Sequence, residues 1–177
     1  MYSLRSLILL GACALAAALL VAGCGGGSSA AETFANVRGQ GFVVPAPSGW
    51  IVKRASTGIS ASPKPVSPQL VSVSVFPLSR DYKPSLYALE VSKELDPGAA
   101  RLARQQNGSL DERRDTRVAG QKARQYVITY SRNGQKLKER ITFLFKKKTE
   151  YELLCQWEES KSEPEYCAKL TSGFRPA

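Results

Sequence analysis

The 177-residue sequence contains no histidine. The Ser–His and Cys–His pairs that activate many nucleophiles are therefore excluded, and so is an imidazole metal site. A glycine run, Gly25–Gly27, lies in a Gly- and Ser-rich stretch and not between a strand and a helix, where a phosphate-binding loop belongs. Two acidic pairs, Asp111–Glu112 and Glu158–Glu159, lack the spacing of a calcium-binding loop. We expect no metal, no cofactor and no catalytic residue.

A long apolar run is also missing. The stretch from Leu7 to Leu20 is shorter than the roughly 20 residues that a membrane-spanning helix needs, and a single cation, Arg5, precedes it. This arrangement is typical of an export signal. The next four residues, Val21-Ala22-Gly23-Cys24, resemble the lipobox of bacterial lipoproteins, in which the cysteine sulfur takes a diacylglyceryl group and the chain is cut just before it.

The lipobox implies where the mature protein is held. We predict that residues 1–23 are a signal peptide and that Cys24 carries the lipid that anchors the protein to the cell membrane, on its extracytoplasmic side. Two acyl chains give stable attachment, whereas one gives only marginal, reversible binding. An ordinary secretory signal with an incidental cysteine is the alternative.

The mature chain is strongly basic. Loss of residues 1–23 removes Arg5 alone among the charged residues, which lowers the formal net charge from +10 to +9. Of the four cysteines, Cys13 leaves with the signal and Cys24 is acylated, so Cys155 and Cys167 remain as a pair in an oxidising compartment. Because they lack the Cys-x-x-Cys spacing of a redox-active pair, we predict a structural disulfide.

The mature chain divides into a linker and one domain. Residues 24–40 are interpreted as the lipidated cysteine and a flexible tether, and residues 41–177 as a single domain. The alternation of Val71, Val73 and Val75 with serines is typical of a strand with one buried face. Residues 55–68, rich in proline and serine, are expected to form an exposed loop. Strands are predicted at residues 42–44, 50–53, 70–76, 123–130, 137–145 and 151–157.

Two helical regions complete the expected fold. Residues 84–106 are expected to bend where Asp96 and Pro97 start a second helix. Ser162 and Glu165 have the spacing of a capping box, and Gly173 is expected to end the last helix. Because the central strands carry large apolar side chains on both faces, the sheet needs cover on both sides. The expected fold class is α+β, with an antiparallel β-sheet of about six strands sandwiched between helices.

Several motifs resemble the PsbP-like family. They are Phe42-Val43-Val44-Pro45 followed by Ser48-Gly49-Trp50, an Ala119–Gly120 corner, and a closing helix before Phe174. The resemblance spans residues 41–174 and implies an α/β/α domain, an antiparallel sheet with helices on both sides. The family includes the extrinsic subunit of photosystem II and many lipoproteins of actinobacterial envelopes, and most members act by binding partners. The resemblance assigns no functional residue.

Basic residues gather in three clusters. They are Arg113, Arg114 and Arg117; Lys136, Lys138 and Arg140; and Lys146, Lys147 and Lys148. Either they form a solvated rim, or they attract an anionic lipid, an acidic wall polymer or an acidic envelope protein. An exported protein rarely meets nucleic acid. We therefore predict a membrane-anchored cell-envelope lipoprotein that is a non-catalytic binding or accessory module. The alternative is an envelope hydrolase that uses carboxylates only.

Overall fold

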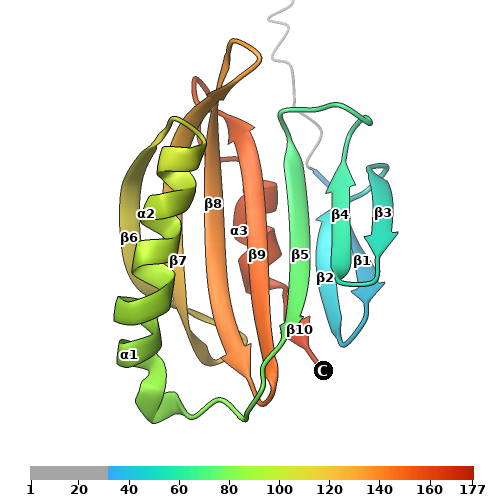
Figure 1. Ribbon diagram of the computed structural model, residues 1–177. Coiled ribbons are helices and arrows are strands. Elements are labelled where there is room, and N and C mark those ends of the chain that lie inside the picture. Colours follow the sequence, from blue (N-terminus) through green and yellow to red (C-terminus); the bar gives the residue numbers. More distant parts are fainter. Residues whose placement is uncertain (1–31) are drawn as a thin grey trace, which may run out of the picture. The chain divides into compact units, whose positions relative to one another are not determined.

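The computed structural model describes residues 32–177, so the predicted signal peptide, Cys24 and the first part of the predicted tether lie outside the described residues. Within that range the chain forms ten strands: β1 (Phe34–Gly39), β2 (Phe42–Pro47), β3 (Ile51–Ala55), β4 (Gly58–Ser62), β5 (Leu70–Pro77), β6 (Ser109–Val118), β7 (Gln121–Arg132), β8 (Gln135–Lys146), β9 (Thr149–Glu158) and β10 (Arg175–Pro176). Seven of them make a large sheet in the order β3-β4-β5-β9-β8-β7-β6, and three make a small sheet in the order β1-β2-β10 (Figure 1). All paired strands are antiparallel.

Helices lie on both faces of the large sheet. One face is covered over β6, β7 and β8 by a continuous helical segment that consists of the 3-10 turn η1 (Pro84–Leu86), α1 (Tyr87–Glu90), the π-helical turn η2 (Val91–Leu95) and α2 (Asp96–Gln105) (Figure 1). Helix α3 (Glu165–Ser172) packs on the opposite face, against β9, β5 and strand β2 of the small sheet. The predicted α+β fold, a sheet with helices on both sides, is confirmed. None of the helices in residues 32–177 is long and apolar enough to cross a bilayer.

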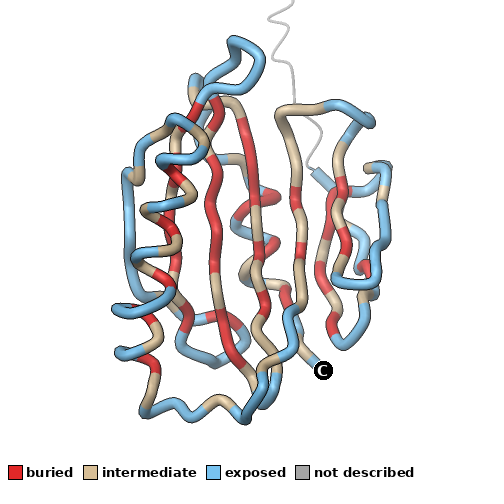
Figure 2. The backbone as a smooth tube through the Cα atoms, viewed as in Figure 1, coloured by how far each residue is buried: buried red, intermediate tan, exposed pale blue. Residues whose placement is uncertain are grey.

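The apolar core has a layer on each side of the large sheet. On one side Val73, Leu153 and Leu170 join the small sheet to α3 and the centre of the large sheet. On the other side Tyr126 and Phe145 pack under the helical segment. The burial pattern in Figure 2 follows this division: β7 and β8 carry buried residues along much of their length, and β6 at the edge is almost wholly exposed. Both alternate sets of side chains are therefore buried in the central strands, as the sequence predicted.

Four strands were not predicted. β1 lies in the segment interpreted as a tether, and β4 lies in the segment interpreted as an exposed loop. β1 has one buried residue, Val37, and β4 has two, Ile59 and Ala61, so neither carries a strong apolar pattern. β6 is highly charged, and β10 has only two residues. Each is specified by backbone pairing with a neighbouring strand, which a single-strand pattern does not reveal.

The helical segment does not restart at Asp96. Asp96 has helical dihedral angles, with φ −63° and ψ −47°, and its N–H donates to the carbonyl of Val91, five residues earlier. This π-type turn precedes Pro97, whose ring would clash with the carbonyl four residues before it in a regular α-helix. The predicted start of a second helix is therefore replaced by a local widening within one helical segment. The side chain of Asp96, which was expected to lie at the start of a second helix, accepts hydrogen bonds from Arg124 and Tyr126 of β7.

The last helix differs from its prediction at one end. The residue before α3 is Pro164, which has no side-chain capping hydrogen bond, so the expected Ser162–Glu165 capping box does not form. Gly173 ends the helix as predicted. A side chain there is excluded by close approach, because an added Cβ would lie 2.6 Å from Pro45 Cγ. The predicted disulfide between Cys155 and Cys167 is present, with a Cα–Cα distance of 5.4 Å.

Candidate functional site

The three basic clusters do not form one continuous rim. Arg113 and Arg114 lie along β6, and Lys136 lies at the start of β8. Lys146 ends the same strand, so ten residues of extended chain, about 33 Å, separate it from Lys136. The structure therefore places the Lys136 cluster and the Lys146 cluster at opposite ends of the large sheet (Figure 1).

One end of the sheet nevertheless gathers cations from several elements. The β6–β7 turn and the β8–β9 turn lie at this end, because Val118 pairs with Gln121 and Lys146 pairs with Thr149. Lys146 Nζ also donates to the Pro176 carbonyl 3.1 Å away, which brings the carboxyl-terminal strand to the same place. The basic end, as we name it, consists of Arg38, Arg117, Lys122, Lys146, Lys147, Lys148 and Arg175. Within residues 32–177 none of these seven forms an ion pair.

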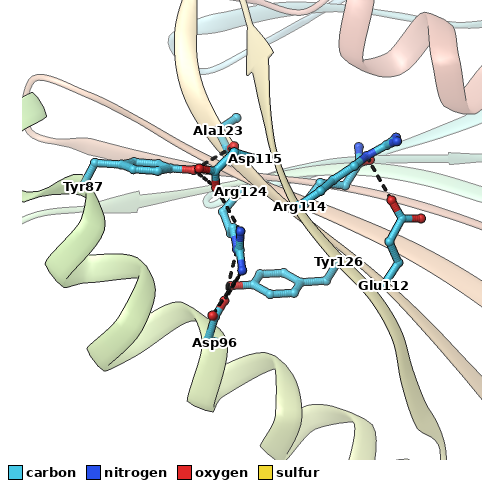
Figure 3. Close-up of polar contacts among 9 residues, drawn as sticks. Tyr87, Asp96, Glu112, Arg114, Asp115, Ala123, Arg124 and Tyr126 are labelled. Carbon is cyan, nitrogen blue, oxygen red and sulfur yellow. Dashed lines mark hydrogen bonds and ion pairs between the residues drawn. The ribbon is translucent and has the colours of Figure 1, made fainter.

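Two other predicted surface cations are not free. Arg140 is only 6% exposed, and its guanidinium is paired with Glu163 next to α3. Burial lowers the pKa of Arg140, and the nearby Glu163 carboxylate opposes that shift. Arg114 Nε lies 3.1 Å from Glu112 and also donates to Gln125 (Figure 3). Arg140 therefore acts within the domain and is poorly placed to bind a polyanion, whereas the Arg114 side chain is paired but remains 56% exposed.

A charged network fastens the helical segment to β6 and β7. Arg124 bridges Asp96, at 3.1 Å, and Asp115, at 2.9 Å, while the Tyr126 hydroxyl donates to Asp96 at 2.6 Å (Figure 3). The Tyr87 hydroxyl lies 2.8 Å from Asp115. Burial alone would raise the pKa of Asp115, but hydrogen bonds from Tyr87 and Arg124 hold it below the usual range. The charges of Asp96 and Asp115 are thus both compensated by Arg124, so the two carboxylates are unsuited to acid–base catalysis.

A cavity of about 330 Å³ opens beside this network, between the helical segment, the loop after β5 and the ends of β8 and β9. Its loop is held by two backbone hydrogen bonds to the β8–β9 turn, from Leu78 to Lys148 and from Tyr82 to Lys147. The apolar lining consists of Leu78, Tyr82, Leu86, Leu95 and Phe145. Three glutamates also line it, Glu90, Glu94 and Glu150. We call it the acidic cavity.

The electrostatics of the acidic cavity are unbalanced. Burial, and then repulsion from Glu152 and Glu90, raises the pKa of Glu150 above its usual range. Burial likewise raises the pKa of Glu152, which lies two residues further along β9. Arg80 is the one cation that lines the cavity, and it lies 4.0 Å from Glu90 with a side chain that is 76% exposed. The carboxylates therefore repel one another with little compensation.

These carboxylates were not identified from the sequence. The acidic pairs noted in the sequence bind neighbouring residues instead. Asp111 accepts hydrogen bonds from Ser109 and Thr129, and Glu158 forms an ion pair with Lys161 at 2.9 Å. Glu150 and Glu152 are two residues apart in β9, so both side chains face the same side of the sheet. This spacing is the one feature of the sequence that could have indicated two neighbouring carboxylates. In residues 32–177 no group of three or more acidic or cysteine side chains is placed to hold a metal ion.

No protein-family model and no curated protein matches the sequence. Solved structures do match. The cyanobacterial PsbP (CyanoP) of Synechocystis sp. PCC 6803 has a TM-score of 0.60 and 11% identity, with 85% of this chain and 96% of that chain covered. A protein from Bacteroides thetaiotaomicron has a TM-score of 0.55 and 11% identity, with 82% of this chain covered but only 48% of that chain, so this chain spans about half its length.

A third structure, LpqN of Mycobacterium tuberculosis, is described as involved in cell envelope biogenesis. It has a TM-score of 0.48 and 15% identity, with 81% of this chain and 90% of that chain covered, which is too weak a similarity to carry an argument. The match to CyanoP shows that this domain has a PsbP-like fold, and the resemblance noted in the sequence is confirmed at that level. At such low identity the comparison establishes the fold alone.

Proposed function

We propose that the mature protein is a lipid-anchored, non-catalytic accessory module of the cell envelope that docks on an anionic partner through its basic end. The observation that supports this most is the set of seven cations at one end of the sheet, none of them in an ion pair within residues 32–177. Unpaired cations near an anionic surface contribute about 1 kcal/mol each. The PsbP-like fold is compatible with such a binding role.

The length of the linker is compatible with this docking. The chain enters the domain at Phe34, opposite Pro47, and β1 then runs to Gly39 beside the basic end. Five residue steps along β1 cover about 17 Å. The nine residues from Gly25 to Thr33 can span at most about 32 Å when fully extended. A domain anchored at Cys24 can therefore turn its basic end to the membrane surface.

The anchor is tested by replacing its sulfur. We expect Cys24→Ala to release the protein from membranes or to leave an uncleaved precursor, whereas the wild-type protein fractionates with membranes and carries a diacylglyceryl mass. Finding the wild-type protein soluble and unacylated by mass spectrometry would refute the anchor.

Docking is tested by salt. Binding of the unacylated mature chain to anionic vesicles should fall steeply between about 0.1 M and 1 M salt, because the Debye length shrinks from about 10 Å to about 3 Å. Binding that does not depend on salt would indicate an apolar contact surface in place of the basic end.

The second candidate, a hydrolase that uses carboxylates only, is favoured by one observation. Glu90 and Glu150 line the same cavity, and the pKa of Glu150 is raised, as in the general acid of a glycosidase. This function predicts turnover of an envelope glycan that is abolished by Glu150→Gln. Absence of turnover across wall and membrane glycans would leave the accessory role as the remaining function.

A further inference from the structure

The acidic cavity holds carboxylates without counter-ions in a protein that is otherwise basic. Within residues 32–177, neither Glu94 nor Glu150 takes part in an ion pair or a side-chain hydrogen bond. Glu90 has only Arg80, at the limiting distance of 4.0 Å. Glu90 and Glu150 are half-buried, whereas Glu94 is exposed at the mouth of the cavity. Half-buried like charges are unfavourable, because each loses hydration and repels its neighbours. A cation from outside the chain would relieve both costs.

The rest of the lining is suited to an organic group. Tyr82 stacks on Phe145 with a ring-centroid distance of 4.7 Å and an interplanar angle of 21°, and both rings line the cavity. Leu86 and Leu95 come from the helical segment on the other side. Phe76, which pairs with Glu150 across β5 and β9, is 42% exposed and lies on the same side of the sheet as that carboxylate. Apolar surface therefore lies next to unneutralised negative charge.

The wall formed by the helical segment contains the π-helical turn. Glu94 and Leu95 belong to η2, the five-residue segment that widens the helix before Pro97. Such turns are frequent at functional sites, since they change the direction of side chains relative to a regular helix. Here the irregular turn contributes one carboxylate and one apolar residue to the cavity.

We propose that the acidic cavity binds a small organic cation, an alkyl- or arylammonium whose nitrogen lies among Glu90, Glu94 and Glu150 and whose apolar body lies against Tyr82 and Phe145. The volume of about 330 Å³ lies at the lower end of the range of ligand pockets, roughly 300–1,000 Å³. A cation next to an aromatic face gains a further attraction. A bare metal ion fits poorly, because within residues 32–177 no three of the acidic side chains converge closely enough to hold one.

The test uses the mature chain with 2-phenylethylammonium as the probe and 2-phenylethanol as its neutral counterpart. We expect saturable binding of the amine by calorimetry and by NMR titration, with the largest shifts at Tyr82, Phe145 and the η2 residues. The neutral alcohol should bind at least about tenfold more weakly, because one charge-assisted hydrogen bond contributes about 1.5–3 kcal/mol. Equal affinity for the two probes, or no saturable binding of the amine below about 10 mM, would overturn the proposal.

A matched pair of variants locates the site. Glu150→Gln should weaken amine binding about tenfold, whereas Glu159→Gln makes the same charge change beyond the opposite end of β9 and should leave affinity unchanged. Glutamine matches glutamate in shape and removes a repulsive charge, so both variants should unfold no more easily than the wild type. Equal loss in both variants would show that the amine responds only to net charge and would overturn the site. Salt-dependent docking of the basic end does not depend on this result.

Discussion

Arg124 should be the most sensitive charged residue of the helix-to-sheet interface. Its side chain is 13% exposed and bridges Asp96 on α2 with Asp115 on β6. Replacement by methionine keeps most of the apolar length but leaves both carboxylates without their cation. Asp96, 24% exposed, is then held against the Tyr126 hydroxyl in a partly dehydrated site.

The expected loss of stability follows from how deeply the Arg124–Asp96 and Arg124–Asp115 ion pairs are buried. Removing one partner of a buried ion pair costs about 3–5 kcal/mol, whereas an exposed pair contributes at most about 1 kcal/mol. The Asp96 pair is mostly buried and the Asp115 pair is half exposed, at 54% for Asp115. We therefore expect Arg124→Met to lower the free energy of unfolding by about 2–4 kcal/mol, measured by urea denaturation.

A matched control is Lys169→Met on α3. Lys169 pairs with Glu165 at 3.4 Å, but the two side chains are 48% and 54% exposed. The expected change is below about 0.5 kcal/mol. In a double-mutant cycle, Arg124→Met should cost much less when Asp96→Asn is already present. A loss below about 1 kcal/mol for Arg124→Met, or full additivity with Asp96→Asn, would refute a structural role for the network.

Three further predictions concern stability. Replacing Cys155 and Cys167 by alanine should cost about 3 kcal/mol, because the disulfide closes a loop of about 13 residues; a loss below about 1 kcal/mol in urea denaturation would contradict this. Glu152→Gln should raise the melting temperature at neutral pH and have little effect near pH 3. Burial raises the pKa of Glu152 in the folded state. The stability that the protonated carboxyl contributes is therefore present below the unfolded pKa and is lost as the pH rises through the folded pKa. A gain that is largest in acid would contradict the shift. Gly98→Ala in α2, where an added Cβ meets nothing within 4 Å, should stabilise the domain by about 0.5–1 kcal/mol. Gly173→Ala should destabilise it by about 1–3 kcal/mol, because the added Cβ would clash with the Pro45 ring. Equal effects of the two alanines would contradict the packing argument.

The sequence predicts the elements that have strong periodic patterns. The alternating valines of β5 and the apolar residues on both faces of β7 and β8 correspond to observed structure. β6 could not be found in this way, because its charged residues disfavour a strand in isolation. Its charges instead protect the free edge of the sheet from pairing with another chain.

The candidate sites depended still more on the tertiary structure. Lys146–Lys148 were identified from the sequence, but Arg38 and Arg175 join them only because β10 pairs with β2 at the same end of the fold. Arg140 looked equivalent to Lys136 and Lys138, and burial beside Glu163 separates it from them. The acidic cavity brings together residues from positions 78 to 150, so no local pattern contains it.

The central claim, that the basic end docks on an anionic surface, is tested most directly by removing its charges without disturbing the fold. Lys147 lies in the β8–β9 turn with φ of +53°, a left-handed conformation that asparagine adopts more readily than lysine. A mature chain with Cys24→Ser, Lys146→Gln, Lys147→Asn and Lys148→Gln should therefore fold normally. The control replaces Lys64, Lys136 and Lys138 by glutamine, which removes the same charge elsewhere.

The measurement is the partition of the two chains onto vesicles containing anionic phospholipid at about 0.1 M salt. Three cations at about 1 kcal/mol each predict on the order of 100-fold weaker binding for the variant of the β8–β9 turn. The control should lose no more than a few-fold, as expected from the change in net charge alone. An equal loss in both chains, or no loss in the turn variant, would contradict docking through the basic end.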